Sequence, residues 1–162
     1  MGTVLSLTFE PNGTGHDDLV LRLGAWAHRS DSYYYELDHA VDQSPDAVQS
    51  IRRLLTGWLA AVKGCGDGEE VLVPHALFDQ CTGWLRCSRR GESFEVVDGW
   101  SNIEGWSFYP SDFSETAKEV ADLRIEEGFG PPLILSRDHL LADIDASLTA
   151  LDDEPETPSQ GS

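Results

Sequence analysis

The sequence is poor in basic residues. Its 162 residues include 11 Lys and Arg against 29 Asp and Glu, which gives a formal net charge of −18 at pH 7. Nucleic-acid binding depends on neutralising phosphates with basic side chains, and binding to anionic membrane surfaces has the same requirement. The composition therefore predicts that the chain binds neither nucleic acid nor a membrane surface directly.

Cysteines and long apolar runs are also scarce. Cys65, Cys81 and Cys87 are odd in number and have no metal-ligand spacing, which argues against a disulfide framework and a zinc site. No run reaches the 18 apolar residues typical of a membrane-spanning helix, and the N-terminal residues lack the basic and apolar regions of a signal peptide. We therefore expect a cytoplasmic protein with reduced thiols.

Signatures of catalysis and of cofactor binding are absent. The five histidines show no His-x-x-x-His spacing, and no glycine-rich phosphate-binding loop occurs. His75, Asp79 and Cys81 would supply a base, an orienting carboxylate and a thiol, but their spacing has no mechanical basis, because His75 is expected to begin a loop after Pro74. The sequence thus predicts no catalytic residue, no metal ion and no cofactor.

The residues that are present indicate an α+β fold with an antiparallel sheet of about five to seven strands. Alternating residues at 3–9 and 19–27 flank a loop rich in Pro, Asn and Gly, which predicts a β-hairpin. Further strands are expected at 33–37, 71–73, 84–89, 94–97 and 103–109, and a short apolar run follows at 133–135. Asp98-Gly99 is interpreted as a turn between the last two of these strands.

Two main helices are predicted, at about 45–63 and 137–151, with their apolar faces packed on one face of the sheet. Ser44 is the expected N-cap of the first helix, with Pro45 at its first position, and Ser136 is the expected N-cap of the second. A shorter helix is expected to begin between residues 111 and 116. Each main helix carries apolar residues at helical spacing, so both are expected to contribute to one core.

The chain is predicted to hold one folded domain, residues 1–151, followed by a disordered acidic tail, residues 152–162. The tail has almost no apolar side chains to bury. It carries four of the negative charges, which leaves −14 on the predicted domain. Most of the acidity is therefore expected on the surface of the folded part.

Residues 99–112 contain the most promising group of candidate binding residues, Trp100, Trp106 and Tyr109. Aromatic walls combined with a few polar groups are typical of a groove for a small molecule or a peptide. The same pattern also suits an aromatic cluster in the core, with the glycines marking close approach of another segment. Both interpretations stay open at this point.

A second candidate site is the cationic group Arg86, Arg89 and Arg90, placed before a predicted turn at Gly91. At the tip of a hairpin these side chains would hold an anion or an acidic loop of a partner. Alternatively, they simply pair with neighbouring carboxylates, in which case each exposed pair contributes no more than about 1 kcal/mol.

The function that these features favour is that of a non-enzymatic interaction protein, such as an inhibitor or an immunity-like protein that engages a basic protein partner. A strongly acidic surface accelerates association with a cationic partner. One alternative is a small-ligand-binding protein that uses the aromatic groove at 99–112, and a second is an enzyme of unknown class. Acidity that serves only solubility or adaptation to salt is the simplest competing explanation.

Overall fold

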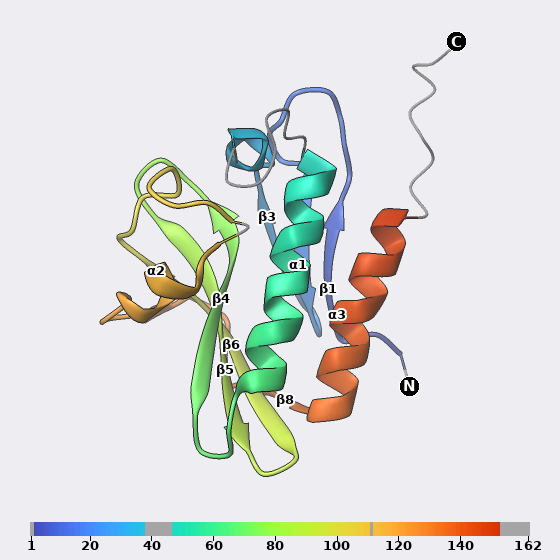
Figure 1. The fold of residues 1–162 in the computed structure, drawn as a ribbon, viewed down its shortest axis with the longest axis vertical. Helices are drawn as coiled ribbons and strands as arrows, with labels where there is room; N and C mark the ends of the chain where they lie inside the picture. Colours follow the sequence, from blue (N-terminus) through green and yellow to red (C-terminus); the bar gives the residue numbers. More distant parts are fainter. Residues whose placement is uncertain (1, 38–46, 111, 153–162) are drawn as a thin grey trace.

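The computed structural model describes residues 2–37, 47–110 and 112–152, and its strands form two antiparallel sheets (Figure 1). The first sheet has the order β1-β2-β3, with β1 (Leu5–Phe9), β2 (Leu19–Leu23) and β3 (Trp26–Ser30). The second sheet has the order β4-β5-β6-β7, and β8 also pairs with β6. Its strands are β4 (Glu70–Leu77), β5 (Thr82–Arg90), β6 (Ser93–Ser101), β7 (Arg124–Ile125) and β8 (Leu133–Ser136).

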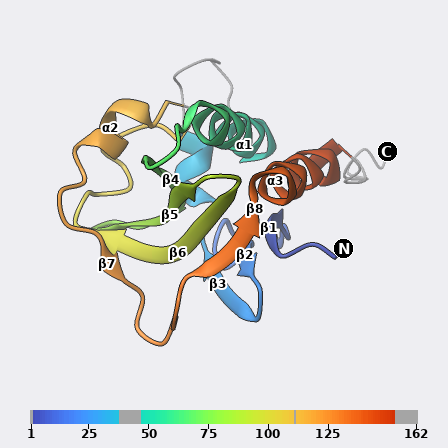
Figure 2. The ribbon, with the colours of Figure 1, turned by 90° about the horizontal axis from the view of Figure 1, so that it is seen from below.

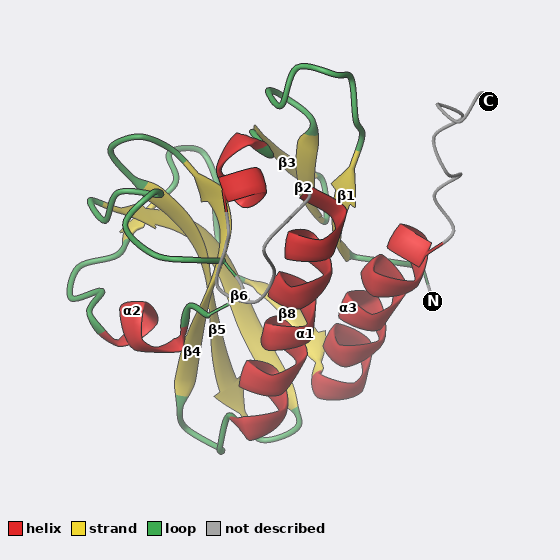
Figure 3. Cartoon of the chain, turned by 45° about the horizontal axis from the view of Figure 1, so that its top comes forward, coloured by secondary structure: helices red, strands yellow, loops and turns green. Residues whose placement is uncertain are grey.

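The two long helices are α1 (Ala47–Gly64) and α3 (Arg137–Asp152). Figures 2 and 3 show them side by side, with the strands of both sheets on one side of them. A short helix, α2 (Ser114–Lys118), and a 3-10 helix, η1 (Tyr33–Leu37), complete the elements of the described part. The α+β prediction with two main helices is confirmed, and the strands divide between two sheets. Among the described residues, no helix combines the length and the apolar composition needed to cross a membrane.

Several local predictions can be compared with the structure. The predicted hairpin is confirmed, since β1 and β2 pair with Leu7 opposite Leu21. The predicted strand at 19–27 is shorter, because β2 ends at Leu23 and a turn at 24–25 leads into β3. Ser136 caps α3, because its Oγ accepts a hydrogen bond of 3.0 Å from the His139 backbone N–H. Ser44 and Pro45 lie outside the described residues, as does the predicted tail, except that Asp152 is the last residue of α3.

The prediction of a strand at 103–109 was wrong, because this segment turns back on itself. The Gly105 N–H donates to the carbonyl of Phe78 at 2.8 Å, and the Ser107 N–H donates to the carbonyl of Glu104 at 3.1 Å. A Cβ atom at Gly105 would lie 2.6 Å from the Phe78 nitrogen, so only glycine allows this approach. The alternating aromatic residues therefore belong to a loop that is fixed to the end of β4.

The prediction of a strand at 33–37 was also wrong, because a side chain closes a turn there. Both carboxylate oxygens of buried Asp18 accept hydrogen bonds from Ser32, one from its backbone N–H at 2.8 Å and one from its hydroxyl at 2.7 Å. The chain then continues as η1, which places the buried Tyr35 side chain in the core. Such side-chain bonds compete with strand pairing.

The core lies between the two long helices and the sheets. Helix α1 contributes its whole apolar face, and Ile51, Leu55 and Trp58 are fully buried. The Trp58 indole N–H donates to the carbonyl of Pro74 in β4 at 2.9 Å, so burial leaves this polar group paired. The periodicity that predicts this helix thus also identifies its buried face.

Helix α3 protects the edge of the first sheet. Strand β1 has β2 on one side only, and an unpaired strand edge is prone to aggregation. Oδ2 of Asp143 accepts hydrogen bonds from the N–H groups of Val4 and Leu5, both at 2.9 Å. Oγ of Ser147 accepts from the Leu7 N–H at 3.1 Å. Two helical side chains therefore replace a neighbouring strand.

We expect Asp143→Ala to lower the free energy of unfolding by about 2 kcal/mol, because it leaves two backbone N–H groups without their acceptor. The measurement is urea denaturation followed by circular dichroism. Asp145→Ala, on an exposed position of the same helix, is the matched control and should change stability by less than about 0.5 kcal/mol. Equal effects of the two substitutions would contradict this account of the β1 edge.

Candidate functional site

A buried carboxylate joins three strands from the two sheets. Asp98 of β6 is 0% exposed, and its Oδ2 accepts hydrogen bonds from the Trp26 Nε1–H and from Nδ1 of His28, both at 2.9 Å. Its Oδ1 accepts from Nε2 of His75 at 2.7 Å. An ionised carboxylate only accepts hydrogen bonds, so both imidazoles donate to it. We call Trp26, His28, His75 and Asp98 the Asp98 cluster.

Strand geometry places Asp98 in the interior. Side chains two residues apart on a strand share a face, and Phe94 and Val96 of the same strand are core residues. The interpretation of Asp98-Gly99 as a turn was wrong, because both residues lie within β6. Glycine is needed at 99 for a different reason, since a Cβ atom there would lie 2.7 Å from the carbonyl oxygen of Arg124 in β7.

His75 lies within β4, whereas the sequence suggested that it begins a loop. The strand continues through Pro74 to Leu77, with an irregularity in its pairing between Pro74 and Ala76. Opposite this point, a Cβ atom at Gly83 would lie only 3.1 Å from Cε1 of His75. The glycine therefore leaves the room that the buried imidazole occupies. Nδ1 of His75 is buried and has no hydrogen-bond partner in the described structure.

The cluster changes the acidity of its members. Burial alone would raise the pKa of Asp98, but the interaction with His75 and the hydrogen bonds from His28, His75 and Trp26 outweigh it and hold this pKa well below its ordinary value. Burial would lower the pKa of His28, but its hydrogen bond to Asp98 and the charges of Asp98 and Glu126 raise this pKa above 6.5. At neutral pH the cluster therefore contains an ionised carboxylate beside an imidazole that readily keeps its proton.

A small cavity opens beside the cluster. Its volume is about 230 Å³, and its lining residues are His28, Phe78, Cys81, Gly83, Trp100 and Glu126. The His28 ring is stacked on Phe78 with centroids 6.4 Å apart. His28 is thus the member of the Asp98 cluster that reaches the cavity, whereas Asp98 and His75 are fully buried behind it.

The cysteine in this cavity is not an activated nucleophile. Burial and the charge of Glu126 raise the pKa of the Cys81 thiol above 9.0. The thiolate, which is the reactive form, is therefore disfavoured. His75 bonds to Asp98 and not to Asp79, which is exposed. The structure consequently does not assemble the base, carboxylate and thiol that lie close together in the sequence.

The three aromatic candidates occupy different environments. Trp100 is half-buried at the end of β6, and the Arg124 guanidinium lies 5.1 Å from the centre of its ring. Trp106 and Tyr109 belong to the loop after β6 and are 62% and 45% exposed. The cavity that Trp100 lines includes neither of them. The structure therefore brings Trp100 to the Asp98 cluster and leaves the other two on the surface.

The three arginines of β5 are also placed differently. Arg90 forms an ion pair of 2.7 Å with Glu95, and Arg89 lies 3.6 Å from Glu92. Arg86 is half-buried in the middle of the strand. Two of the three positive charges are therefore close to carboxylates of the following strand or turn, so little cationic surface is left at the hairpin tip.

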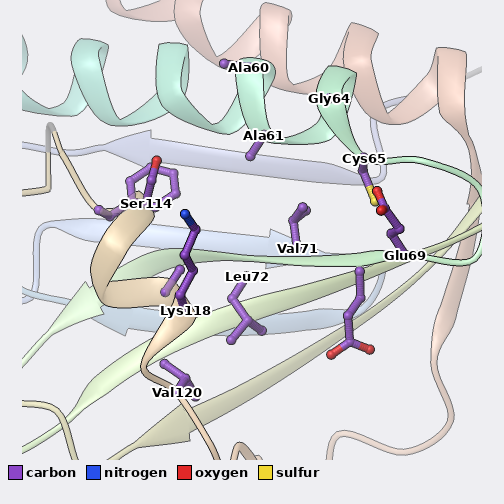
Figure 4. A pocket seen from close by; sticks show the side chains of 13 residues that line it. Ala60, Ala61, Gly64, Cys65, Glu69, Val71, Leu72, Ser114, Lys118 and Val120 are labelled. Carbon is purple, nitrogen blue, oxygen red and sulfur yellow. The ribbon is translucent and has the colours of Figure 1, made fainter.

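A larger cavity of about 470 Å³ lies between α1, β4 and α2 (Figure 4). Its walls are formed mainly by small and apolar side chains, including Ala61 and Val71. Two of its polar groups already have partners: Glu69 accepts from the Gly66 N–H at 2.7 Å, and Lys118 pairs with Glu115 at 2.9 Å. The walls of this cavity are mainly apolar, whereas the Asp98 cluster holds the imidazole and carboxylate groups, which can bind ligands or titrate.

Comparison of the chain with protein-family models, with curated proteins and with solved structures gave no match. The functional argument therefore depends on the geometry alone. Sequence reasoning did not identify His28, His75 and Asp98 as a group, because they are 47 and 23 residues apart. The signal that could have identified this group is Asp98 itself, an acidic residue on the same strand face as the core residues Phe94 and Val96.

The two pKa shifts predict how stability depends on pH. A raised pKa of His28 in the folded state stabilises the fold below about pH 6.5, and this contribution is lost as the pH rises through the folded-state pKa. A lowered pKa of Asp98 stabilises the fold above about pH 4, and this contribution is lost as the pH falls. We therefore expect the free energy of unfolding to decline as the pH rises above about 6.5 and through the raised folded-state pKa of His28.

Urea denaturation in buffer with a chelator measures this decline. His28→Gln should flatten the alkaline part of the profile, whereas His16→Gln, which removes an exposed histidine paired with Asp31, should leave the wild-type slope. An unchanged slope in His28→Gln would disprove the assignment of the alkaline decline to His28.

Proposed function

We propose that the protein is a non-enzymatic protein-binding module, of the inhibitor or immunity-like kind, that engages a basic protein partner. The observation that carries this proposal is the exposed Trp106 on an acidic loop. Exposed apolar side chains that gather in one patch indicate an interaction site, and Trp106 and Tyr109 are exposed on the same loop. Trp and Tyr are also enriched among the residues that dominate binding energy. We expect the partner to cover Trp106 and Tyr109.

Trp106 is held in position before any partner binds. Its indole N–H donates to the carbonyl of Asp79 at 3.1 Å, and the neighbouring Phe108 is stacked on buried Trp84 with centroids 5.8 Å apart. A side chain that is already oriented loses less conformational entropy on binding. The loop is therefore suited to present an aromatic anchor.

Carboxylates line a groove formed in part by the loop that carries this anchor. This groove, of about 380 Å³, is lined by residues of the same loop, such as Glu104, and by residues after α2, such as Glu119 and Asp122. We call these three acids, together with Trp106 and Tyr109, the acidic aromatic surface. Its charges match a partner rich in Lys and Arg, and complementary charges mainly increase the association rate and specificity.

The rest of the molecule has the same sign. The segments outside the described residues hold six acids and no Lys or Arg, so the described part keeps 23 acids against 11 basic residues, a net charge of −12. The long-range field of this body attracts a cationic partner, and the acidic aromatic surface supplies local contacts. The small-ligand alternative has less support, because Trp100 lies apart from Trp106 and Tyr109.

A displayed library of random peptides, selected on the full chain, tests the proposal. We expect enrichment of peptides rich in Lys and Arg, and Trp106→Ala should weaken the selected peptides by about 2 kcal/mol, roughly 30-fold in Kd. Ile134→Ala is the matched control, because Ile134 is 68% exposed on β8 and should leave Kd within about twofold. Selection of neutral or acidic peptides, or equal binding by Trp106→Ala, would refute the proposal.

The acids of the surface are tested by a double charge reversal, compared with a control pair that changes the net charge by the same amount. Glu119→Lys with Asp122→Lys should lower the association rate at low salt by about tenfold and reduce its salt dependence. Asp138→Lys with Asp145→Lys changes the net charge by the same amount on exposed positions of α3 and should have a smaller effect. Stopped-flow fluorescence of a selected peptide gives both rates. Equal losses would show that net charge alone attracts the peptide.

A further inference from the structure

We propose that His28, His75 and Asp98 form a binding site for one divalent transition-metal ion, with zinc as the best-suited ion. This site is separate from the acidic aromatic surface, and the proposal does not depend on the protein-binding function. It is carried by three potential ligands from β3, β4 and β6 whose donor atoms all lie within 4.8 Å of one another.

The observed distances are close to those that a metal ion requires. Nδ1 of His28 and Nε2 of His75 lie 2.9 and 2.7 Å from the nearest oxygens of Asp98. Around a tetrahedral zinc ion with bonds of about 2.0–2.2 Å, neighbouring ligand atoms are about 3.3 Å apart. Small outward shifts of the two imidazoles would bring these contacts to that spacing, and the two nitrogens, which lie within 4.8 Å of each other, would have to reach the same spacing for coordination by a shared ion.

The donor types and charges select the kind of ion. Two imidazole nitrogens with one carboxylate suit zinc and similar first-row ions, whereas magnesium and calcium prefer oxygen ligands only. A divalent ion would be balanced by Asp98 and by Glu126, which lines the cavity next to His28. The complete site would then carry no net charge in the interior, where an uncompensated charge is costly.

The surroundings both support the site and limit its affinity. The Trp26 N–H fixes the Asp98 carboxylate at 2.9 Å, as the outer partners of metal ligands commonly do. Coordination through Nε2 of His75 would leave its proton on Nδ1, which has no partner in the described structure. A missing outer partner typically weakens metal binding by about 10–100-fold, so we expect moderate affinity.

The cavity provides the remaining coordination position. Catalytic zinc sites have three protein ligands and a fourth position for water, and the three proposed ligands His28, His75 and Asp98 would leave such a position open. His28 lines the cavity of about 230 Å³, so an ion and its water reach the cluster past this residue. This room makes His28 the ligand whose removal disturbs the core least.

Cobalt titration of the full chain tests the site. After treatment with a chelator, the wild type should bind one Co²⁺ per chain, with visible d–d bands that Zn²⁺ abolishes and Mg²⁺ does not. His28→Gln should lose the bands, and Trp26→Phe should weaken binding by about 10–100-fold. His16→Gln, which removes a surface histidine beside a carboxylate, should bind as the wild type does.

Absence of the bands at millimolar Co²⁺, or wild-type affinity in His28→Gln, would overturn the proposal. Thermal melting shows whether each variant is folded. If His28→Gln does not fold, NMR of the wild type decides: Co²⁺ should broaden the ring signals of His28 and His75 before those of His139, which lies on α3. Earlier broadening of the His139 signals would place the ion elsewhere and refute the site.

Discussion

The buried carboxylate of Asp98 is the constraint on which the relation between the two sheets depends. An ionised carboxylate in the interior is tolerated only when its oxygens are fully hydrogen-bonded. Here the donors come from β3 of the first sheet and β4 of the second, while the carboxylate belongs to β6. Neither sheet satisfies Asp98 alone, so docking of the sheets and pairing of the carboxylate are one event. The cavity beside His28 is a consequence, because the imidazole that pairs with Asp98 also forms part of its wall.

The abundant acidic residues divide into two groups with different tasks. Asp18, Asp98 and Asp143 are buried, and each uses its carboxylate to accept hydrogen bonds that would otherwise be unpaired: at the turn into η1, between the sheets and along the edge of β1. The exposed acids stabilise little individually, since surface ion pairs contribute about 0–1 kcal/mol. Their collective field is the property that a basic partner can recognise. Composition alone does not separate these groups, because burial defines them.

The aromatic residues after Asp98 show the same division within a few positions. Trp100 remains on β6 and lines the cavity of the Asp98 cluster, whereas Gly105 bends the chain against Phe78 and directs Trp106 to the surface. The chain thereby supplies two separate regions from one aromatic segment. One concentrates imidazole and carboxylate groups, and the other combines an oriented indole with acids. A metal ion and a basic protein are distinct occupants for these two regions.

Local patterns were sufficient for the elements that depend on local interactions. The apolar spacing identified α1 and α3, Ser136 identified a helix start, and the alternation at 3–9 and 19–27 identified a hairpin. The same reasoning was wrong for 33–37 and 103–109, where contacts from distant residues override strand propensity. It also did not identify the Asp98 cluster, whose members are far apart in sequence. The sequence by itself determined the fold class, the helices and the net charge. Only the tertiary structure decided which acids, histidines and tryptophans meet, because burial and pairing across two sheets are properties of the folded chain.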